Sequence, residues 1–260
     1  MKTKLLLVLS MLSLAGGVLA HDHQQCPVKW KQLDNAIKTA QAAPGGNGGL
    51  GFHMWATVVN AQGVVCAVAK SGDGMNAQWL GSRAISAQKA YSAAAFSLSA
   101  NDNPGNSLDG LALSTANLYS AVQPGGSLFG LQHSNPVDTE WAYAGNGKKF
   151  GRIDDPMTGR RVGGINVFGG GLALYDENGK LVGAVGVSGD TSCADHNIAW
   201  RVRDVLALDH VPNGLTTGQG DNIIYDIDAT GKSASGFGHP ECAPGVAAIN
   251  ADVVAAHPLN

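Results

Sequence analysis

Charged residues are scarce in this sequence, and no cluster of basic residues is present. Only 14% of the residues are charged, and 17 Lys and Arg stand against 20 Asp and Glu, which gives a formal net charge of −3. Proteins whose main partner is nucleic acid or an anionic membrane carry concentrated positive charge. We therefore expect neither of these to be the main partner.

Several motifs of catalysis and metal binding are also missing. The sequence contains no Cys-x-x-Cys pair, no EF-hand loop, no P-loop and no dinucleotide fingerprint. Gly186-Val187-Ser188-Gly189-Asp190 is similar to a hydrolase nucleophile elbow, but Asp190 occupies the position of the final glycine. No set of acid, base and nucleophile remains, so the sequence favours a protein that is not an enzyme.

The sequence has one long apolar run, and it lies at the N-terminus. Lys2 and Lys4 precede an apolar run from Leu5 to Leu14, and small residues complete the segment. This order is typical of a secretory signal peptide over residues 1–20, and the run is too short to span a membrane. We therefore expect a secreted or periplasmic protein that begins at His21 and has no membrane span.

The four cysteines all follow the predicted signal peptide. An even number in an exported chain favours two disulfides over a metal cluster. The count permits three pairings. We expect Cys26 to pair with Cys66 and Cys193 with Cys242, because each bond would attach a terminal segment to the adjacent half of the core.

The most informative segment runs from Gly163 to Trp200. Runs rich in Val, Leu and Ala flank Asp176-Glu177-Asn178-Gly179, which predicts a strand, an Asn-Gly turn and a second strand. After Ser188-Gly189-Asp190 the apolar spacing becomes that of a helix, and residues that can cap a helix stand at its start. The segment is therefore predicted to form a hairpin that leads into a helix.

The first half of the chain repeats this order less clearly. Strands are predicted at Phe52–Val59 and Val64–Ala69, and apolar spacing predicts a long helix from Ala84 to Leu98. A further helix is expected over residues 30–40, ending before Pro44. We interpret the two hairpins as pseudo-symmetric halves of one sheet.

A chain of about 240 residues is large enough for one substantial core, so residues 21–260 are expected to form a single domain. Two irregular stretches belong to it, an insertion at about 101–161 and a tail at about 211–260. A short helix is expected across Leu108–Val122 and a strand at Ile223–Ile227. Long connections inside a compact domain are usually functional or form interfaces.

Three segments together resemble a known family. They are Val58-Val59-Asn60-Ala61-Gln62-Gly63, Ser82 to Ala94, and Gly163-Gly164-Ile165-Asn166 with Leu181 to Gly189. By these residues the chain resembles the GlcG/HbpS-like family, also called the haem-degrading or DUF336 family, over roughly Trp30 to Leu208. The resemblance implies a profilin-like α/β (α+β) fold, a five-stranded antiparallel sheet with packed helices, and assembly into homo-oligomers.

The resemblance also implies a function. Members of this family include secreted haem-binding proteins linked to haem or iron sensing, and a haem-binding domain attached to cobalamin adenosyltransferases. We therefore expect an exported protein that binds haem for sensing or scavenging, with slow haem degradation as a further activity. Two alternatives stay open: an accessory protein or enzyme acting on a small organic acid, and a structural module that forms oligomers.

A haem site needs an apolar slot, an axial ligand to iron and cations for the propionates. The candidate axial donors are His53, His133, His196, His210 and His239. We favour His53, beside an aromatic strand, and His196, which Asp195 can orient. Phe168, before three glycines, is expected to face the macrocycle, and Arg83 a propionate. Hydrogen-bonding roles for the histidines and a tight strand crossing at the glycines remain alternatives.

Two groups of residues suggest other metal sites. If the mature chain begins at His21, its free amine, two amides and the His23 imidazole can form a square-planar site for Cu(II) or Ni(II), with a disordered terminus as the alternative. Carboxylates in irregular segments can bind a hard cation, although solvated turn residues are their usual explanation. These carboxylates are Asp154, Asp155, Asp221, Asp226 and Asp228.

Overall fold

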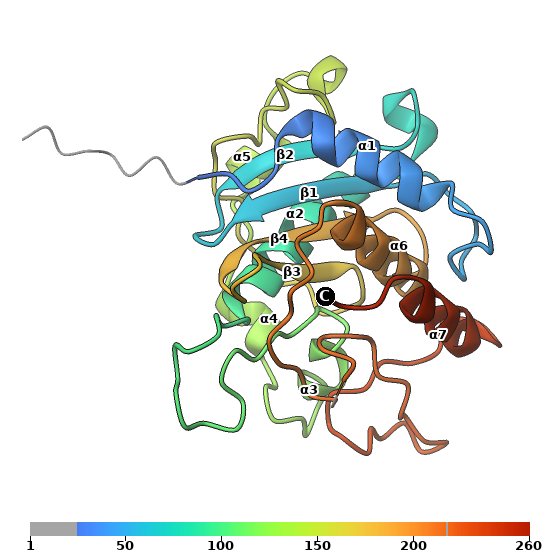
Figure 1. The fold of residues 1–260 in the computed structure, drawn as a ribbon. Helices are drawn as coiled ribbons and strands as arrows, with labels where there is room; N and C mark the ends of the chain where they lie inside the picture. Colours follow the sequence, from blue (N-terminus) through green and yellow to red (C-terminus); the bar gives the residue numbers. More distant parts are fainter. Residues whose placement is uncertain (1–24, 217) are drawn as a thin grey trace, which may run out of the picture.

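A computed structural model describes residues 25–216 and 218–260 (Figure 1). The predicted signal peptide and the proposed metal ligands His21 and His23 lie outside the described residues. Within the described part of the chain, no helix is both long enough and apolar enough to cross a membrane.

The core of the fold is a single antiparallel sheet built from the two predicted hairpins. Its strands are β1 (Trp55–Asn60), β2 (Val65–Lys70), β3 (Gly171–Tyr175) and β4 (Leu181–Ser188), in the spatial order β2-β1-β4-β3. The hairpins join through their inner strands, which pair from Trp55 opposite Ser188 to Asn60 opposite Gly183. The α+β class and both hairpins are therefore confirmed.

The expectation of five strands is wrong for the described residues, which form four. Residues 223–227 make one isolated bridge, between Ile227 and Ser233. Carboxylates organise this stretch instead: Asp226 accepts hydrogen bonds from Ser233 and Ser235, and Asp228 accepts backbone N–H bonds from Thr230 and Lys232. Such side-chain bonds compete with a strand ladder and favour turns.

Long helices cover both faces of the sheet (Figure 1). The helices α1 (Trp30–Gln41) and α6 (Ser192–Val205) pack on one face, and α7 (Val246–Ala256) packs on α6. The helix α2 (Gly81–Ala95) covers the other face through a row of buried alanines. Gly186 lets α2 approach β4 closely, because a Cβ at this position would collide with the backbone of Ser86 and Ala90.

The insertion contains short helices, and the one predicted from Leu108 to Val122 is mostly wrong. Its helical part is α3 (Leu118–Ala121), because side chains of the preceding loop bind the backbone themselves, as Asn117 does with Ser114. The remaining short elements are η1 (Met75–Ala77), α4 (Leu131–Ser134), α5 (Thr139–Tyr143) and η2 (Gly147–Lys149).

Two disulfides attach the outer segments of the chain to the core. Cys26 is bonded to Cys66 on β2, and Cys193 on α6 is bonded to Cys242 in the tail. These are the two pairings expected from the sequence. The two bonds close loops of 40 and 49 residues. In the chain-entropy model, each bond raises the free energy of the unfolded chain, and so stabilises the fold, by about 4 kcal/mol.

Candidate functional site

An open hollow lies between α1, the end of β2 and the loop at residues 147–153. Its volume is about 590 Å³. The apolar part of its wall is made by Trp30, Met75, Phe150 and Ile153. Charged residues stand around it: Lys38, Lys70, Lys148, Arg152, Asp34 and Asp73. The hollow therefore has four cationic and two acidic side chains, on a chain whose formal net charge is negative.

The cations of this hollow lie close enough to repel one another. Lys38 is paired with Asp34 at 2.8 Å, whereas the Lys70 ammonium donates to the backbone oxygens of Gly72 and Asp73, both at 2.9 Å. Burial lowers the pKa of Lys70, and the positive charge of Lys38 lowers it further. A bound anion would relieve this repulsion, so the hollow suits a ligand with negative charge.

The apolar wall is held in place by tight backbone contacts. The Trp30 indole N–H donates to the carbonyl oxygen of Gly151 at 3.2 Å. Gly151 has a positive φ of 72°, and a Cβ there would lie 2.9 Å from the Lys70 side chain and 3.0 Å from the Trp55 ring. A glycine is therefore needed at 151, both for its conformation and for the approach of the loop to β2.

Arg83 supports the hollow from the interior. It is buried, forms a two-bond ion pair with Asp155, and donates to the carbonyl oxygen of Ala142 at 2.9 Å. Asp155 in turn accepts the backbone N–H of Gly151 at 2.8 Å, and the guanidinium lies 3.8 Å from the centre of the Phe150 ring. Arg83 thus holds the loop that forms the wall, and each of its three nitrogens donates to a partner within the protein.

His53 is exposed and does not itself line the hollow, but it lies beside Gly72, which does. Its Nδ1 lies 3.0 Å from the Ser71 hydroxyl, and a Cβ on Gly72, which lines the hollow, would lie 3.1 Å from the imidazole. With Nδ1–H donating to Ser71, Nε2 is the atom left to bind a metal. An exposed aromatic pair, Phe52 and Trp79, has its ring centres 5.2 Å apart next to this segment.

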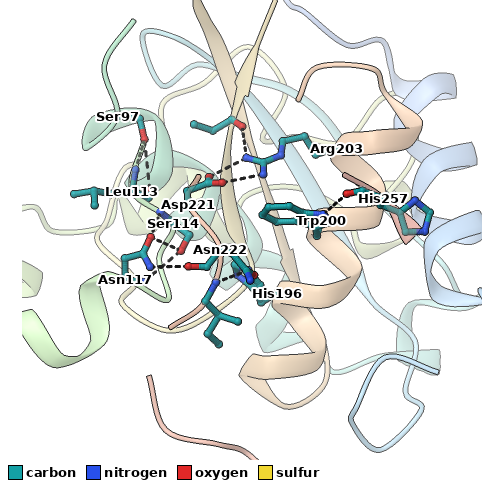
Figure 2. A network of polar contacts seen from close by, with 12 residues as sticks. Ser97, Leu113, Ser114, Asn117, His196, Trp200, Arg203, Asp221, Asn222 and His257 are labelled. Carbon is teal, nitrogen blue, oxygen red and sulfur yellow. Dashed lines mark hydrogen bonds and ion pairs between the residues drawn. The ribbon is translucent and has the colours of Figure 1, made fainter. Parts of the chain in front are cut away.

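His196 lies instead in a buried polar network, which Figure 2 shows. Its Nε2 accepts the backbone N–H of Ile223 at 3.1 Å and contacts Asn222, whose amide exchanges hydrogen bonds with Asn250. Burial lowers the pKa of His196 to about 4, so the ring is neutral at pH 7. His196 does not line the hollow.

Phe168 and its glycines form a close crossing of three elements. The Phe168 ring centre lies 4.3 Å from the Lys89 ammonium, which is paired with Asp195 at 2.6 Å. A Cβ on any of the three following glycines would collide with the backbone of α6, β4 or α2. These glycines therefore serve packing, and neither Phe168 nor Arg83 lines the hollow.

A comparison with protein families bears on this arrangement. The family model described as "Haem degrading protein HbpS-like" matches residues 29–203. The chain belongs to this family. The resemblance inferred from the sequence is therefore confirmed, and the tail beyond residue 203, with Cys242, lies outside the part that matches the HbpS-like family.

Solved structures of similar proteins are also found. Protein ORFY of Klebsiella pneumoniae is 24% identical, with 68% of this chain and 86% of that one covered and a TM-score of 0.44. PduOC, crystallised as a complex with heme, is 22% identical, with 67% and 89% covered and a TM-score of 0.42. A double mutant of Streptomyces reticuli HbpS is 16% identical, with 76% and 98% covered and a TM-score of 0.44. No curated protein sequence matches the chain.

Two buried carboxylates of this HbpS-like chain were misinterpreted from the sequence. Asp155 and Asp221 are not solvated turn residues, because each is fully buried and paired with an arginine. Asp221 binds Arg203 through two hydrogen bonds of 2.8 Å (Figure 2). An arginine within the apolar face of α6 is the signal that could have revealed this pair, since a buried cation requires a partner.

The buried imidazole predicts a pH dependence for this HbpS-like chain. His196 has a pKa of about 4 when folded and 6.5 as the reference value, so the unfolded chain binds a proton that the folded chain excludes. This contribution to stability is complete above about pH 6.5 and is lost as the pH falls toward 4, by up to about 3 kcal/mol. Urea unfolding between pH 7.5 and 4.5 measures the slope.

The variant His196→Gln should show a shallower decline of stability with falling pH than the wild type. His133→Gln, at an exposed position, is the matched control and should keep the wild-type slope. Parallel pH profiles for His196→Gln and the wild type would contradict the prediction, whatever the stability of either protein at pH 7.5.

Proposed function

We propose that this chain binds haem in the hollow between α1, β2 and the loop at residues 147–153. The observation that carries this proposal is the combination of aromatic walls with a surplus of cations on an acidic chain. Haem has the same two characters, a flat apolar macrocycle and two propionates. The volume of about 590 Å³ lies within the usual range of ligand pockets.

Each part of the ligand has proposed partners in this site. Trp30 and Phe150 would contact the macrocycle, and Lys70 and Arg152 would bind the propionates. His53 is the proposed axial ligand, because it is exposed beside Gly72 of the hollow wall and Ser71 can orient its ring. Arg83 is then a positioning residue. Haem-contacting roles for His196 and Phe168 stay predictions, and neither side chain lines this hollow.

A haem titration followed at the Soret band tests the proposal. The wild type should show a saturable shift with one haem per chain. Lys70→Glu with Arg152→Glu should weaken binding at least about tenfold, because two attractive charges become repulsive. Lys180→Glu with Lys232→Glu makes the same change of charge at exposed positions outside the hollow and should leave the affinity unchanged.

A second set of spectra tests the iron ligand. His53→Ala should change the Soret position of the bound haem, whereas His133→Ala should not. The absence of a saturable shift at micromolar haem would overturn the proposed function. If the variant with Lys70→Glu and Arg152→Glu binds haem as tightly as its control, the hollow is not the haem site.

The same cations also support the alternative of a small organic acid as ligand. Lys70 and Arg152 would bind its carboxylates without any need for the aromatic wall. This alternative predicts a rise in melting temperature with small carboxylates in haem-free protein, and none in the variant with both charges reversed.

Export is part of the proposal as well, supported by two disulfides, which persist in oxidising compartments.

A further inference from the structure

A second group of metal-ligating side chains lies where the tail meets the start of α6. The ligand atoms of Cys193, His239 and Cys242 are all within 4.8 Å of one another. Cys193 and His239 are buried, at 0% and 1% exposure, and Cys242 is half-buried. None of the three lines the proposed haem site. Two sulfurs and an imidazole nitrogen are a ligand set that Zn²⁺ and Cu(I) prefer.

The imidazole of His239 is already oriented for such a role. Its Nδ1 lies 2.8 Å from the carbonyl oxygen of Pro240, and because a carbonyl oxygen can only accept, Nδ1 carries the ring proton. The lone pair is therefore on Nε2, which lies 3.2 Å from the Ser192 hydroxyl, and the same hydroxyl lies 3.4 Å from the Cys242 sulfur. A backbone carbonyl that fixes the tautomer in this way is typical of histidines that bind metals.

The sulfur of Cys242 is surrounded by hydrogen-bond donors. It accepts the backbone N–H of Cys193 at 3.1 Å, and the Ser192 hydroxyl lies 3.4 Å away. Both donors belong to the first turn of α6, a helix of 14 residues, where backbone N–H groups have no partner within the helix. Such donors stabilise a thiolate more than a neutral sulfur, so they favour the reduced, metal-binding form of Cys242.

We propose that reduction of the Cys193–Cys242 disulfide creates a site for a thiophilic cation such as Zn²⁺, held by both sulfurs and His239 Nε2. A dithiol reductant transfers two electrons and two protons to the disulfide and becomes a disulfide itself. The cation then replaces the two thiol protons, which pass to solvent. Three protein ligands leave the fourth tetrahedral position open. In the oxidised chain the sulfurs are bonded to each other, so the redox state decides whether metal binds.

Zinc binding to the full chain tests this site. The protein is reduced with a phosphine, freed of reductant without oxygen, and titrated with Zn²⁺ against a chromophoric chelator. Reduced wild type should bind one Zn²⁺ per chain at this site and the oxidised protein none. Cys193→Ser with Cys242→Ser should abolish binding, whereas Cys26→Ser with Cys66→Ser should keep it. His239→Gln should weaken binding at least about tenfold, and His210→Gln, outside the cluster, should not.

A second measurement needs no variant. In the reduced wild type, Zn²⁺ should slow alkylation of Cys193 and Cys242 at least about tenfold and leave Cys26 and Cys66 reactive, as peptide mass spectrometry reports. The proposal is overturned if the reduced chain binds no Zn²⁺, if all four cysteines react alike with Zn²⁺ present, or if folded His239→Gln binds as tightly as the wild type.

Discussion

Replacing Lys89 with methionine is expected to lower the free energy of unfolding by about 3–5 kcal/mol, a large part of the stability of an ordinary domain. Lys89 is fully buried on α2, and its ammonium binds Asp195 on α6 at 2.6 Å and the carbonyl oxygen of Val187 at 3.1 Å. Methionine fills the same volume but leaves the carboxylate of Asp195 without its partner. Urea unfolding at pH 7.5 measures the loss.

The cost of Lys89→Met should depend on pH. Burial raises the pKa of Asp195 to about 6, and removal of the lysine raises it further. A raised carboxyl pKa stabilises the folded chain at low pH, and this contribution to stability is lost as the pH rises through the pKa of the folded state. The difference in free energy of unfolding between Lys89→Met and the wild type should therefore be smaller at pH 5 than at pH 8. If the loss of stability in Lys89→Met is the same at pH 5 and pH 8, it does not arise from the unpaired carboxylate of Asp195.

Two further variants separate the ion pair from general packing. Lys89→Met combined with Asp195→Asn should recover most of the stability, since the oxygen of the introduced amide can still accept the backbone N–H groups of Gly189 and Asp190. Lys31→Met, at an exposed position on α1, should change the free energy of unfolding by no more than about 0.5 kcal/mol. If Lys89→Met costs no more than Lys31→Met, the buried pair does not stabilise the fold.

Arg83→Met is expected to cause a similar loss of about 3–5 kcal/mol, with an additional local effect. Without the guanidinium, Asp155 is a buried carboxylate whose remaining partners are backbone N–H groups, including that of Gly151. The loop that carries Phe150 then loses its anchor. If the proposed haem site is correct, the folded Arg83→Met protein should bind haem at least about tenfold more weakly than the wild type.

Lys89→Met is the matched control for this effect, because it removes a buried cation of the same helix that does not adjoin the hollow. Both variants should be destabilised, but only Arg83→Met should lose haem affinity when measured well below its melting temperature. Equal affinities in the two variants would show that Arg83 has no role in shaping the site. Arg161→Met, at an exposed position, should match the wild type in stability.

The elements that were predicted correctly depend on short stretches of sequence. Asn178-Gly179 specifies a turn because Gly179 adopts a positive φ of 69°, and Asp176 accepts the backbone N–H groups of Asn178 and Lys180 across it. The capping of α6 by Thr191 is equally local. The failed strand at 223–227 has the right apolar residues, but the carboxylates of Asp226 and Asp228 bind the backbone N–H groups of Ser235 and Thr230 and form turns instead.

The hollow was not predictable in the same way. Trp30 and Phe150 are separated by more than a hundred positions along the chain, and no spacing in the sequence brings α1 and the insertion together. Arg83 was selected for its charge, but its partner Asp155 lies 72 residues away in a segment without regular structure. His53 was selected from its own neighbours, an aromatic strand and a Ser-Gly turn, and its role as an iron ligand stays a prediction.

The two cations of α2 also constrain the order in which the chain can fold during synthesis. The partner of Arg83, Asp155, follows it by 72 residues, and the partner of Lys89, Asp195, follows it by 106 residues. The strand β1 can pair with β4 only after β4 has been synthesised. A nascent chain that ends before residue 195 therefore holds a helix with at least one cation on its apolar side and no counterion. We therefore expect the N-terminal half not to fold alone, because the partners of Arg83 and Lys89, and the strand β4 that pairs with β1, all lie in the second half of the chain.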